Sequence, residues 1–190
     1  GQAFALDRHD RILGILPFFH SFGFTGTLWL PPLLGLGAVY HPNPVDGRGI
    51  GELVCEHRAT FLLATPTFLQ IYMRACTPEQ FGSVQFVLAG AEKLPERLAA
   101  AFEDRFGLRP MEGYGTTETS PVVTINTRDF RSAGFRQVGA KRGSIGHPLP
   151  GMVARIVDPD TGVPVALGQA GLLLVKGPNV MQGYLGQAEK

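Results

Sequence analysis

The chain has 190 residues, 44% of them hydrophobic, and a formal net charge of +1 at pH 7. This length can bury a substantial core in one domain or two small ones, and the composition excludes a disordered chain. The balanced charge gives no reason to expect a nucleic-acid partner or strong attraction to an anionic membrane. The cysteines Cys55 and Cys76 lack metal-ligand spacing, which favours reduced thiols in a cytoplasmic protein.

Both ends of the sequence indicate a piece of a longer protein. The chain starts at Gly1 without a methionine and stops after a polar segment at Lys190, and no signal-peptide pattern occurs. The most apolar window, residues 18–39, contains His20, Pro31 and Pro32. A buried, bent helix therefore fits this window better than a membrane span of about 20 apolar residues.

Strands and helices are predicted to alternate over residues 10–115. Short apolar runs predict strands, and apolar residues at helical spacing predict the helices between them. The strands are expected at residues 11–16, 38–40, 61–64, 84–89 and 108–112, and the helices at residues 22–34, 49–58, 95–106 and from Pro66 onward. This alternation is typical of a parallel, helix-covered sheet, so we predict an α/β subdomain over residues 1–121.

After residue 121 the pattern changes to short strands and turns without a long helix. Strands are expected at residues 122–125, 153–157 and 171–176, and residues 126–142 are predicted to be a polar loop. We therefore predict a smaller antiparallel β subdomain over residues 122–190.

Groups able to bind a ligand are concentrated between residues 111 and 121. Gly115 lets the backbone approach a ligand closely, and Tyr114 offers a flat face to a base. Thr116 and Thr117 can donate hydrogen bonds to phosphate oxygens, and the Glu118 carboxylate can hold Mg²⁺. The simpler alternative is a tight glycine-rich turn with incidental polar residues.

A second loop, Gly90-Ala91-Glu92, follows the strand predicted at residues 84–89. Ligands bind at the carboxyl ends of parallel strands, and right-handed crossovers can bring such loops together. We therefore expect this loop to lie beside residues 114–118.

Taken in order, these motifs resemble those of the adenylate-forming enzymes, which include acyl-CoA synthetases, firefly luciferase and the adenylation domains of peptide synthetases. The matching segments are residues 16–23 (Leu-Pro-Phe-Phe-His-Ser-Phe-Gly), 90–92, 114–118, 143–148 and 177–184. They cover nearly the whole chain. The resemblance implies that both subdomains belong to one larger adenylation domain that is truncated at both ends.

The resemblance also implies a two-step reaction that uses ATP and Mg²⁺. A carboxylate attacks the α-phosphate of ATP, and a phosphopantetheine thiol then takes the acyl group. Thr117 would donate to the α-phosphate, Glu118 would hold Mg²⁺, and His20 would lie near the carboxylate end of the acyl pocket. A structural role within its aromatic loop is the alternative for His20. The nucleotide-binding residues implied are Gly90, Ala91, Glu92, Tyr114, Gly115, Thr116 and Thr117.

Within this family, residues 89–94 and 112–123 resemble the ligase half of the bifunctional acyl-acyl carrier protein synthetase/2-acylglycerophosphoethanolamine acyltransferase. That branch implies a fatty acid substrate, acyl carrier protein as the acceptor, a lysophospholipid used by an upstream acyltransferase domain, and a parent protein at the inner membrane. An acyl-CoA synthetase that uses CoA and a peptide-synthetase adenylation domain are alternatives. A non-catalytic nucleotide-binding or interaction module is an alternative of another class.

Other parts of the family pattern have no counterpart in the sequence. The phosphate loop, the ribose-binding string and the C-terminal lid are not found, so we expect the 190-residue chain alone to be inactive and to bind ATP weakly or not at all. The basic segment 128–142 matches no landmark. It is interpreted as a solvated loop, with contact to a carrier protein or a lipid headgroup as the alternative. Its basic residues are Arg128, Arg131, Arg136, Lys141 and Arg142.

Overall fold

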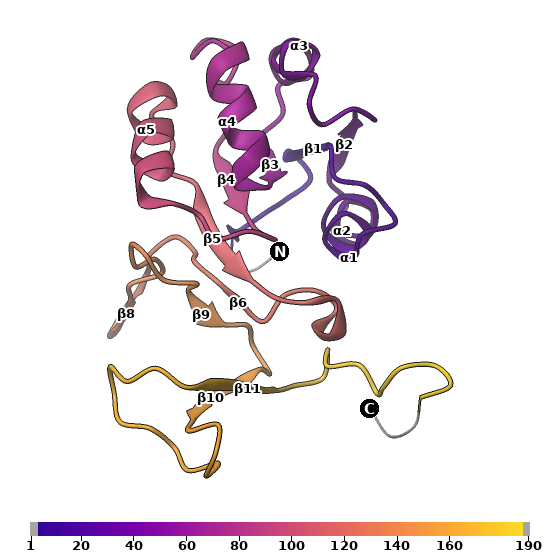
Figure 1. Ribbon diagram of the computed structural model, residues 1–190. Helices are drawn as coiled ribbons and strands as arrows, with labels where there is room; N and C mark the ends of the chain where they lie inside the picture. Colours follow the sequence, from indigo (N-terminus) through magenta and orange to yellow (C-terminus); the bar gives the residue numbers. More distant parts are fainter. Residues whose placement is uncertain (1–3, 188–190) are drawn as a thin grey trace.

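The computed structural model describes residues 4–187 and shows a mixed sheet covered by helices, with two small antiparallel sheets beside it (Figure 1). This arrangement confirms the predicted α/β fold class. Residues 1–3 and 188–190, on which the expectation of truncated ends rests, lie outside the described part.

The parallel part of the sheet has the strand order β2-β1-β3-β4-β5. Its strands are β1 (Arg11–Gly14), β2 (Gly37–Tyr40), β3 (Phe61–Ala64), β4 (Phe86–Ala89) and β5 (Met111–Tyr114). Every residue of β3 and β4 is buried, as expected for central strands covered on both faces. The carboxyl ends of all these strands lie at one edge of the sheet, where ligands bind in such folds.

Three helices lie side by side along one side of the sheet: α3 (Gly47–His57), α4 (Pro66–Ala75) and α5 (Glu96–Phe106) (Figure 1). The Asp46 and Thr65 side chains accept backbone N–H groups at the starts of α3 and α4, which satisfies donors that have no partner within the helix. Gly107 ends α5 in the left-handed conformation that glycine adopts without steric cost.

The bent helix predicted over residues 22–34 consists of three consecutive segments. They are α1 (Ser21–Gly23), the π-helix η2 (Phe24–Trp29) and α2 (Leu30–Leu34). The change from π to α hydrogen bonding comes just before Pro31 and Pro32, which have no backbone N–H to donate. Within residues 4–187, no helix is both long enough and apolar enough to span a membrane.

Past residue 121 the same sheet continues with antiparallel strands. Residues 114–124 form a turn containing the 3₁₀ helix η3 (Thr117–Thr119), and β6 (Thr124–Ile125) then returns beside β5. β9 (His147–Pro148) pairs with β6. β5 lies before the expected boundary at residues 121 and 122, and its partner β6 lies after it, in the same sheet. The division into two subdomains stays a prediction.

The segment predicted as a polar loop over residues 126–142 contains a hairpin, so the loop prediction was wrong for its two short strands. β7 (Phe130–Ser132) and β8 (Phe135–Gln137) pair with each other around Gly134, which has a φ of 74°. The rings of Phe130 and Phe135 lie on one face with centroids 6.1 Å apart. This cross-strand aromatic pair stabilises the hairpin. Its strands have three residues each, and the surrounding charged residues hide their pattern in the sequence.

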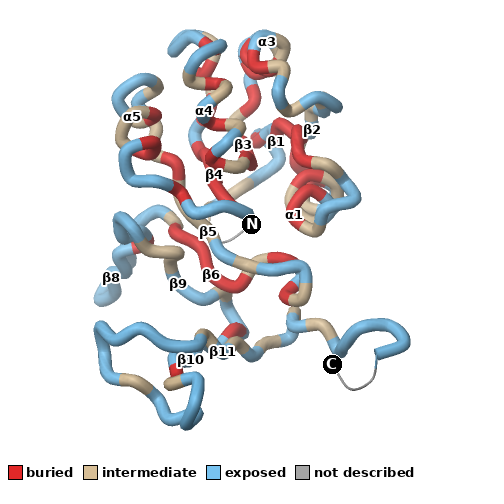
Figure 2. Tube along the Cα trace, viewed as in Figure 1, coloured by how far each residue is buried: buried red, intermediate tan, exposed pale blue. Residues whose placement is uncertain are grey.

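Burial is concentrated in the α/β part of the molecule (Figure 2). The core lies between the parallel strands and α3–α5, and it includes Tyr72, Phe81 and Phe102 at full burial. β10 (Val153–Val157) and β11 (Leu172–Lys176) form a separate antiparallel pair that is mostly exposed. The part of the fold that positions ligand-binding loops is therefore also the best packed.

Candidate functional site

Loops that follow β1, β4 and β5 meet at the carboxyl edge of the sheet and enclose a cavity of about 180 Å³. Residues far apart in the sequence thus share one site, as was expected for the loops after residues 89 and 113. The cavity is lined by His20, Ser21, Phe22, Leu88, Ala89, Gly90, Ala91, Gly113, Tyr114, Gly115, Thr116, Thr117, Pro121 and Val122.

His20 has a defined structural role as well as a place in the cavity wall. Its Nδ1 accepts the backbone N–H of Phe22 at 3.1 Å and caps α1. In the neutral imidazole this bond leaves the proton on Nε2, which is then a donor. The cap gives His20 a structural role, and its place near the carboxylate end of an acyl pocket stays a prediction.

Next to His20, Ser21 brings the loop after β1 into contact with the loop after β5. Ser21 Oγ lies 3.3 Å from Thr117 Oγ1, within hydrogen-bond distance. Neither the spacing nor the type of Ser21 singled it out in the sequence, because its partner is not local.

The loop after β4 approaches the aromatic ring of Phe22. A Cβ atom added at Gly90 would lie 3.1 Å from that ring, so glycine keeps the backbone close to the cavity. Ala91 has a φ of 67°, in the left-handed region that costs a non-glycine residue about 1 kcal/mol or more. Glu92 lies outside the cavity lining, and its Oε2 accepts a hydrogen bond from Thr67 Oγ1 at 2.7 Å.

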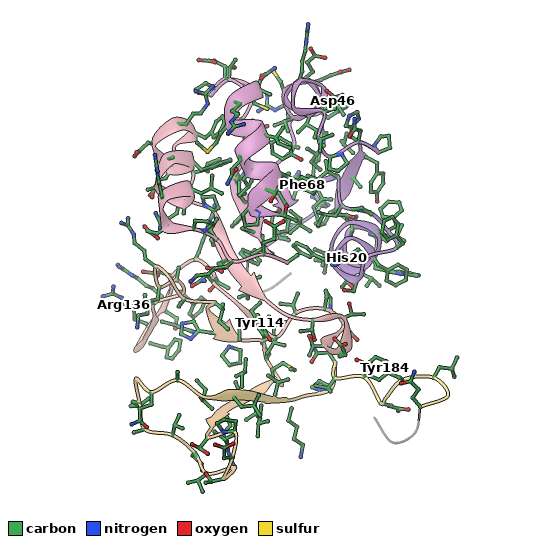
Figure 3. The ribbon with its side chains drawn as sticks, viewed as in Figure 1. His20, Asp46, Phe68, Tyr114, Arg136 and Tyr184 are labelled. Carbon is green, nitrogen blue, oxygen red and sulfur yellow. The ribbon has the colours of Figure 1, made fainter. Side chains whose placement is uncertain are left out.

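The turn between β5 and β6 is held by its own threonines. The Thr119 hydroxyl accepts the backbone N–H of Thr116 and donates to the Thr116 carbonyl, both at 2.9 Å. A Cβ at Gly115 would overlap the carbonyl oxygen of Pro121, so only glycine fits this crossing of the chain. Tyr114 remains 38% exposed, with its ring available to a ligand (Figure 3).

Glu118 points away from the cavity lining toward the segment that follows β11. Its Oε1 accepts a hydrogen bond from the Tyr184 hydroxyl at 2.6 Å. This bond, together with its own backbone N–H and the Thr116 hydroxyl, holds the pKa of Glu118 below its usual value. The same bond raises the pKa of Tyr184. Glu118 is therefore ionised at neutral pH, which a cation ligand requires.

Two more contacts join residues 177–184 to this turn. Asn179 Nδ2 donates to the carbonyls of Thr119 and Val122 at 2.6 and 2.8 Å. The backbone N–H of Met181 donates to the Glu118 carbonyl at 2.8 Å. The sequence marked residues 177–184 as a landmark but gave no role to Tyr184 or Asn179, because these contacts span about 60 residues.

A divalent cation fits the site only as a partner shared with a phosphate. No group of three or more His, Cys, Asp or Glu side chains that could hold a metal occurs within residues 4–187. Mg²⁺ is commonly bound by one or two carboxylates plus phosphate oxygens and water. Glu118 is the carboxylate that would hold it, beside the hydroxyls of Thr116 and Thr117.

Comparisons with known proteins identify the family of the chain. The family profile of the AMP-binding enzymes matches residues 1–185. The chain is 33% identical over 186 residues to a long-chain-fatty-acid–CoA ligase of Bacillus subtilis, and this match covers 95% of the chain and 31% of that protein. It is 34% identical over 184 residues to a feruloyl-CoA synthase of Amycolatopsis sp, with 95% and 35% covered.

Among solved structures, ATP-bound MatB from Rhodopseudomonas palustris superposes with a TM-score of 0.85 at 29% identity, covering 99% of this chain and 35% of MatB. The chain therefore belongs to the AMP-binding enzyme family of adenylate-forming ligases. It spans about a third of the length of the curated relatives it matches.

Proposed function

We propose that this chain is part of an ATP-dependent, AMP-forming acid–thiol ligase that acts on a fatty acid. The observation that carries the proposal is the single cavity in which the loops after β1, β4 and β5 meet. A chain-like acid, a nucleotide and a thiol must meet at one point in this reaction, and loops at the carboxyl edge of a sheet supply such a point.

The nucleotide half of the proposal uses the loops after β4 and β5. The Gly90 backbone, Ala91 and the Tyr114 ring form a surface for adenine, with Glu92 at its outer rim. The Thr116 and Thr117 hydroxyls and the turn at Gly115 face the phosphates. The similarity of the chain to MatB, which was solved with ATP bound, supports a nucleotide site in this fold.

The chemical half requires charge on the α-phosphate to be neutralised while the acid attacks. The acid's oxygen forms a bond to the α-phosphorus, and the bond to pyrophosphate breaks. Thr117 would donate a hydrogen bond to the α-phosphate. Mg²⁺, held by Glu118, would supply positive charge to the phosphates. The His20 Nε2–H would hold the incoming carboxylate beside Thr117.

In the second half-reaction a phosphopantetheine thiol attacks the acyl carbon, and AMP leaves. We propose acyl carrier protein as the thiol carrier and a lysophospholipid as the final acyl acceptor of an upstream domain, with the parent at the inner membrane. CoA is the rival acceptor, and the names of the Bacillus subtilis and Amycolatopsis relatives favour it. The free thiols of Cys55 and Cys76 agree with a cytoplasmic site of action.

ATP–pyrophosphate exchange tests the first half-reaction. The complete gene product is expected to exchange label with fatty acids of some chain length and to lose exchange in Glu118→Gln. Product thioesters formed with CoA and with holo-acyl carrier protein then decide the acceptor. Absence of exchange with fatty acids, hydroxycinnamic acids and amino acids alike would contradict the ligase and favour a non-catalytic nucleotide-binding module.

The 190-residue chain alone is proposed to be inactive, because it spans only about a third of the length of the curated relatives it matches. The purified chain is expected to show no exchange and weak or no heat of ATP binding in calorimetry. Micromolar binding would show that the described residues form a more complete site.

A further inference from the structure

Residues 177–184 reach back over the turn between β5 and β6 and contact it at three successive points. Asn179 contacts the carbonyls of Thr119 and Val122, Met181 contacts the Glu118 backbone, and Tyr184 contacts the Glu118 side chain. Figure 3 labels Tyr184 on the arm that follows β11. The turn that carries Glu118 is thus held from outside by a segment far along the chain.

The Tyr184 contact differs from the other two because it reaches the carboxylate itself. The Tyr184 hydroxyl donates to Oε1 of the Glu118 carboxylate at 2.6 Å, and the Thr116 hydroxyl and the Glu118 N–H also act on that carboxylate. A glutamate on a one-turn 3₁₀ helix has several freely rotating side-chain bonds. A strong, charge-assisted bond to one carboxylate oxygen restricts this rotation.

We propose that Tyr184 is a positioning residue: its bond to Oε1 of Glu118 holds the carboxylate in the orientation in which it meets a divalent cation. This inference rests on the proposed function, since it assigns a partner to the carboxylate proposed to hold Mg²⁺. Residues that orient a metal's ligands typically change its affinity by about 10- to 100-fold when they are removed.

The orientation of the Glu118 carboxylate affects where a cation can bind. Within residues 4–187, no group of three or more acidic, histidine or cysteine side chains surrounds Glu118 to hold a cation by itself. The remaining ligands would be phosphate oxygens and water, whose positions follow the nucleotide. The direction of the Glu118 carboxylate would therefore influence where the cation lies relative to the phosphates.

Mn²⁺ binding in the presence of ATP, measured by electron paramagnetic resonance on the complete gene product, tests the proposal without relying on turnover. Tyr184→Phe keeps a ring that is 46% exposed and removes the hydroxyl alone. We expect it to weaken Mn²⁺ binding by about tenfold and to leave ATP binding in EDTA unchanged. Glu118→Gln is expected to weaken Mn²⁺ binding at least as much.

Tyr40→Phe is the matched control. Its hydroxyl donates to the Thr27 carbonyl at 2.9 Å, outside the cavity, so Mn²⁺ affinity should match that of the unmodified protein. Equal losses of metal-free ATP and Mn²⁺ binding in Tyr184→Phe would reveal a merely structural role and overturn the proposal.

The remaining outcomes distinguish failure of the Tyr184 positioning role from failure of the proposed ligase function. If Glu118→Gln weakens Mn²⁺ binding and Tyr184→Phe does not, the positioning role is overturned while the proposed ligase function stands. If Glu118→Gln has no effect on Mn²⁺, the metal role of Glu118 fails and the role of Tyr184 fails with it. If the unmodified protein binds no ATP, the proposed function itself is overturned.

Discussion

Ser21 Oγ lies 3.3 Å from Thr117 Oγ1, although the two residues are 96 positions apart in the sequence. Ser21 lies in α1, between β1 and β2, and Thr117 lies in the turn after β5. This contact joins the loop proposed to hold the acid to the loop proposed to hold the α-phosphate. In the proposed reaction, this side-chain contact would help the sheet to set the distance between the two reactants.

Ser21→Ala removes this contact and leaves the Thr117 hydroxyl without its protein partner. An exposed hydrogen bond contributes about 0.5–1.5 kcal/mol, so kcat/KM for ATP–pyrophosphate exchange should fall by roughly 2- to 10-fold. Ser83→Ala is the control, because its hydroxyl donates to the Ala59 carbonyl away from the cavity. Identical kinetics for both variants would show that the contact does not align the loops.

Gly115→Ala should disrupt the turn more than a comparable substitution elsewhere. Its Cβ would overlap the Pro121 carbonyl, which is backbone and cannot rotate away. Gly107→Ala is the control: it meets no atom within 4 Å and carries only the cost of its left-handed φ, about 1–2 kcal/mol. Thermal unfolding should show the larger loss for Gly115→Ala, and equal losses would contradict the overlap.

The two cysteines should react at very different rates. Cys76 is 1% exposed, its thiol donates to the Gly47 carbonyl, and burial raises its pKa from 9.0 to about 11. Cys55 is exposed. At pH 8 iodoacetamide should modify Cys55 rapidly and Cys76 only at the rate of unfolding, and Cys55→Ser should abolish the fast phase. Rapid modification of both thiols would contradict the burial.

The raised pKa of Cys76 also predicts a dependence of stability on pH. Between pH 9 and 11 the folded protein keeps the thiol proton that the unfolded chain loses, so the folded state binds more protons. The free energy of unfolding should therefore decrease as pH rises through this window, and the contribution is fully present below pH 9. Urea unfolding of Cys76→Ala should lack this component of the decrease.

Asn179→Asp should destabilise the contact with the turn far more than Asn179→Ala. The amide group donates both its hydrogens to the Thr119 and Val122 carbonyls, and its own Oδ1 is buried without a partner. Aspartate would place a carboxylate oxygen against those carbonyls, at a cost of more than about 2 kcal/mol. Urea unfolding midpoints measure the difference, and equal stability of the two variants would refute this arrangement.

The sequence was most informative where local pattern and burial agree. The strand at Phe61–Ala64 has the predicted bounds, because it is a short apolar run between Thr60 and the cap Thr65. The loops after β4 and β5 could be placed together for the same reason: a parallel sheet brings carboxyl ends to one edge. The α/β class follows from patterns of this kind.

Features that depend on distant contacts could not be predicted. The π-helix at Phe24–Trp29 has no pattern that separates it from an α-helix, and the β7–β8 hairpin lies in a segment that reads as charged and polar. The bond from Tyr184 to Glu118 joins residues 66 positions apart. The residues around Tyr184 and Glu118 in the sequence give no sign of this pairing. It depends on the path of the chain after β11, which leads back to the turn.

The turn that carries Thr117 and Glu118 is the connection of a hairpin, with β5 and β6 both paired in the central sheet. Its two ends cannot separate without breaking sheet hydrogen bonds. The turn is therefore anchored at both ends by the central sheet. The loop that carries His20 and Ser21 meets this turn through the Ser21 and Thr117 hydroxyls, a contact that can break without disturbing the pairing of the sheet.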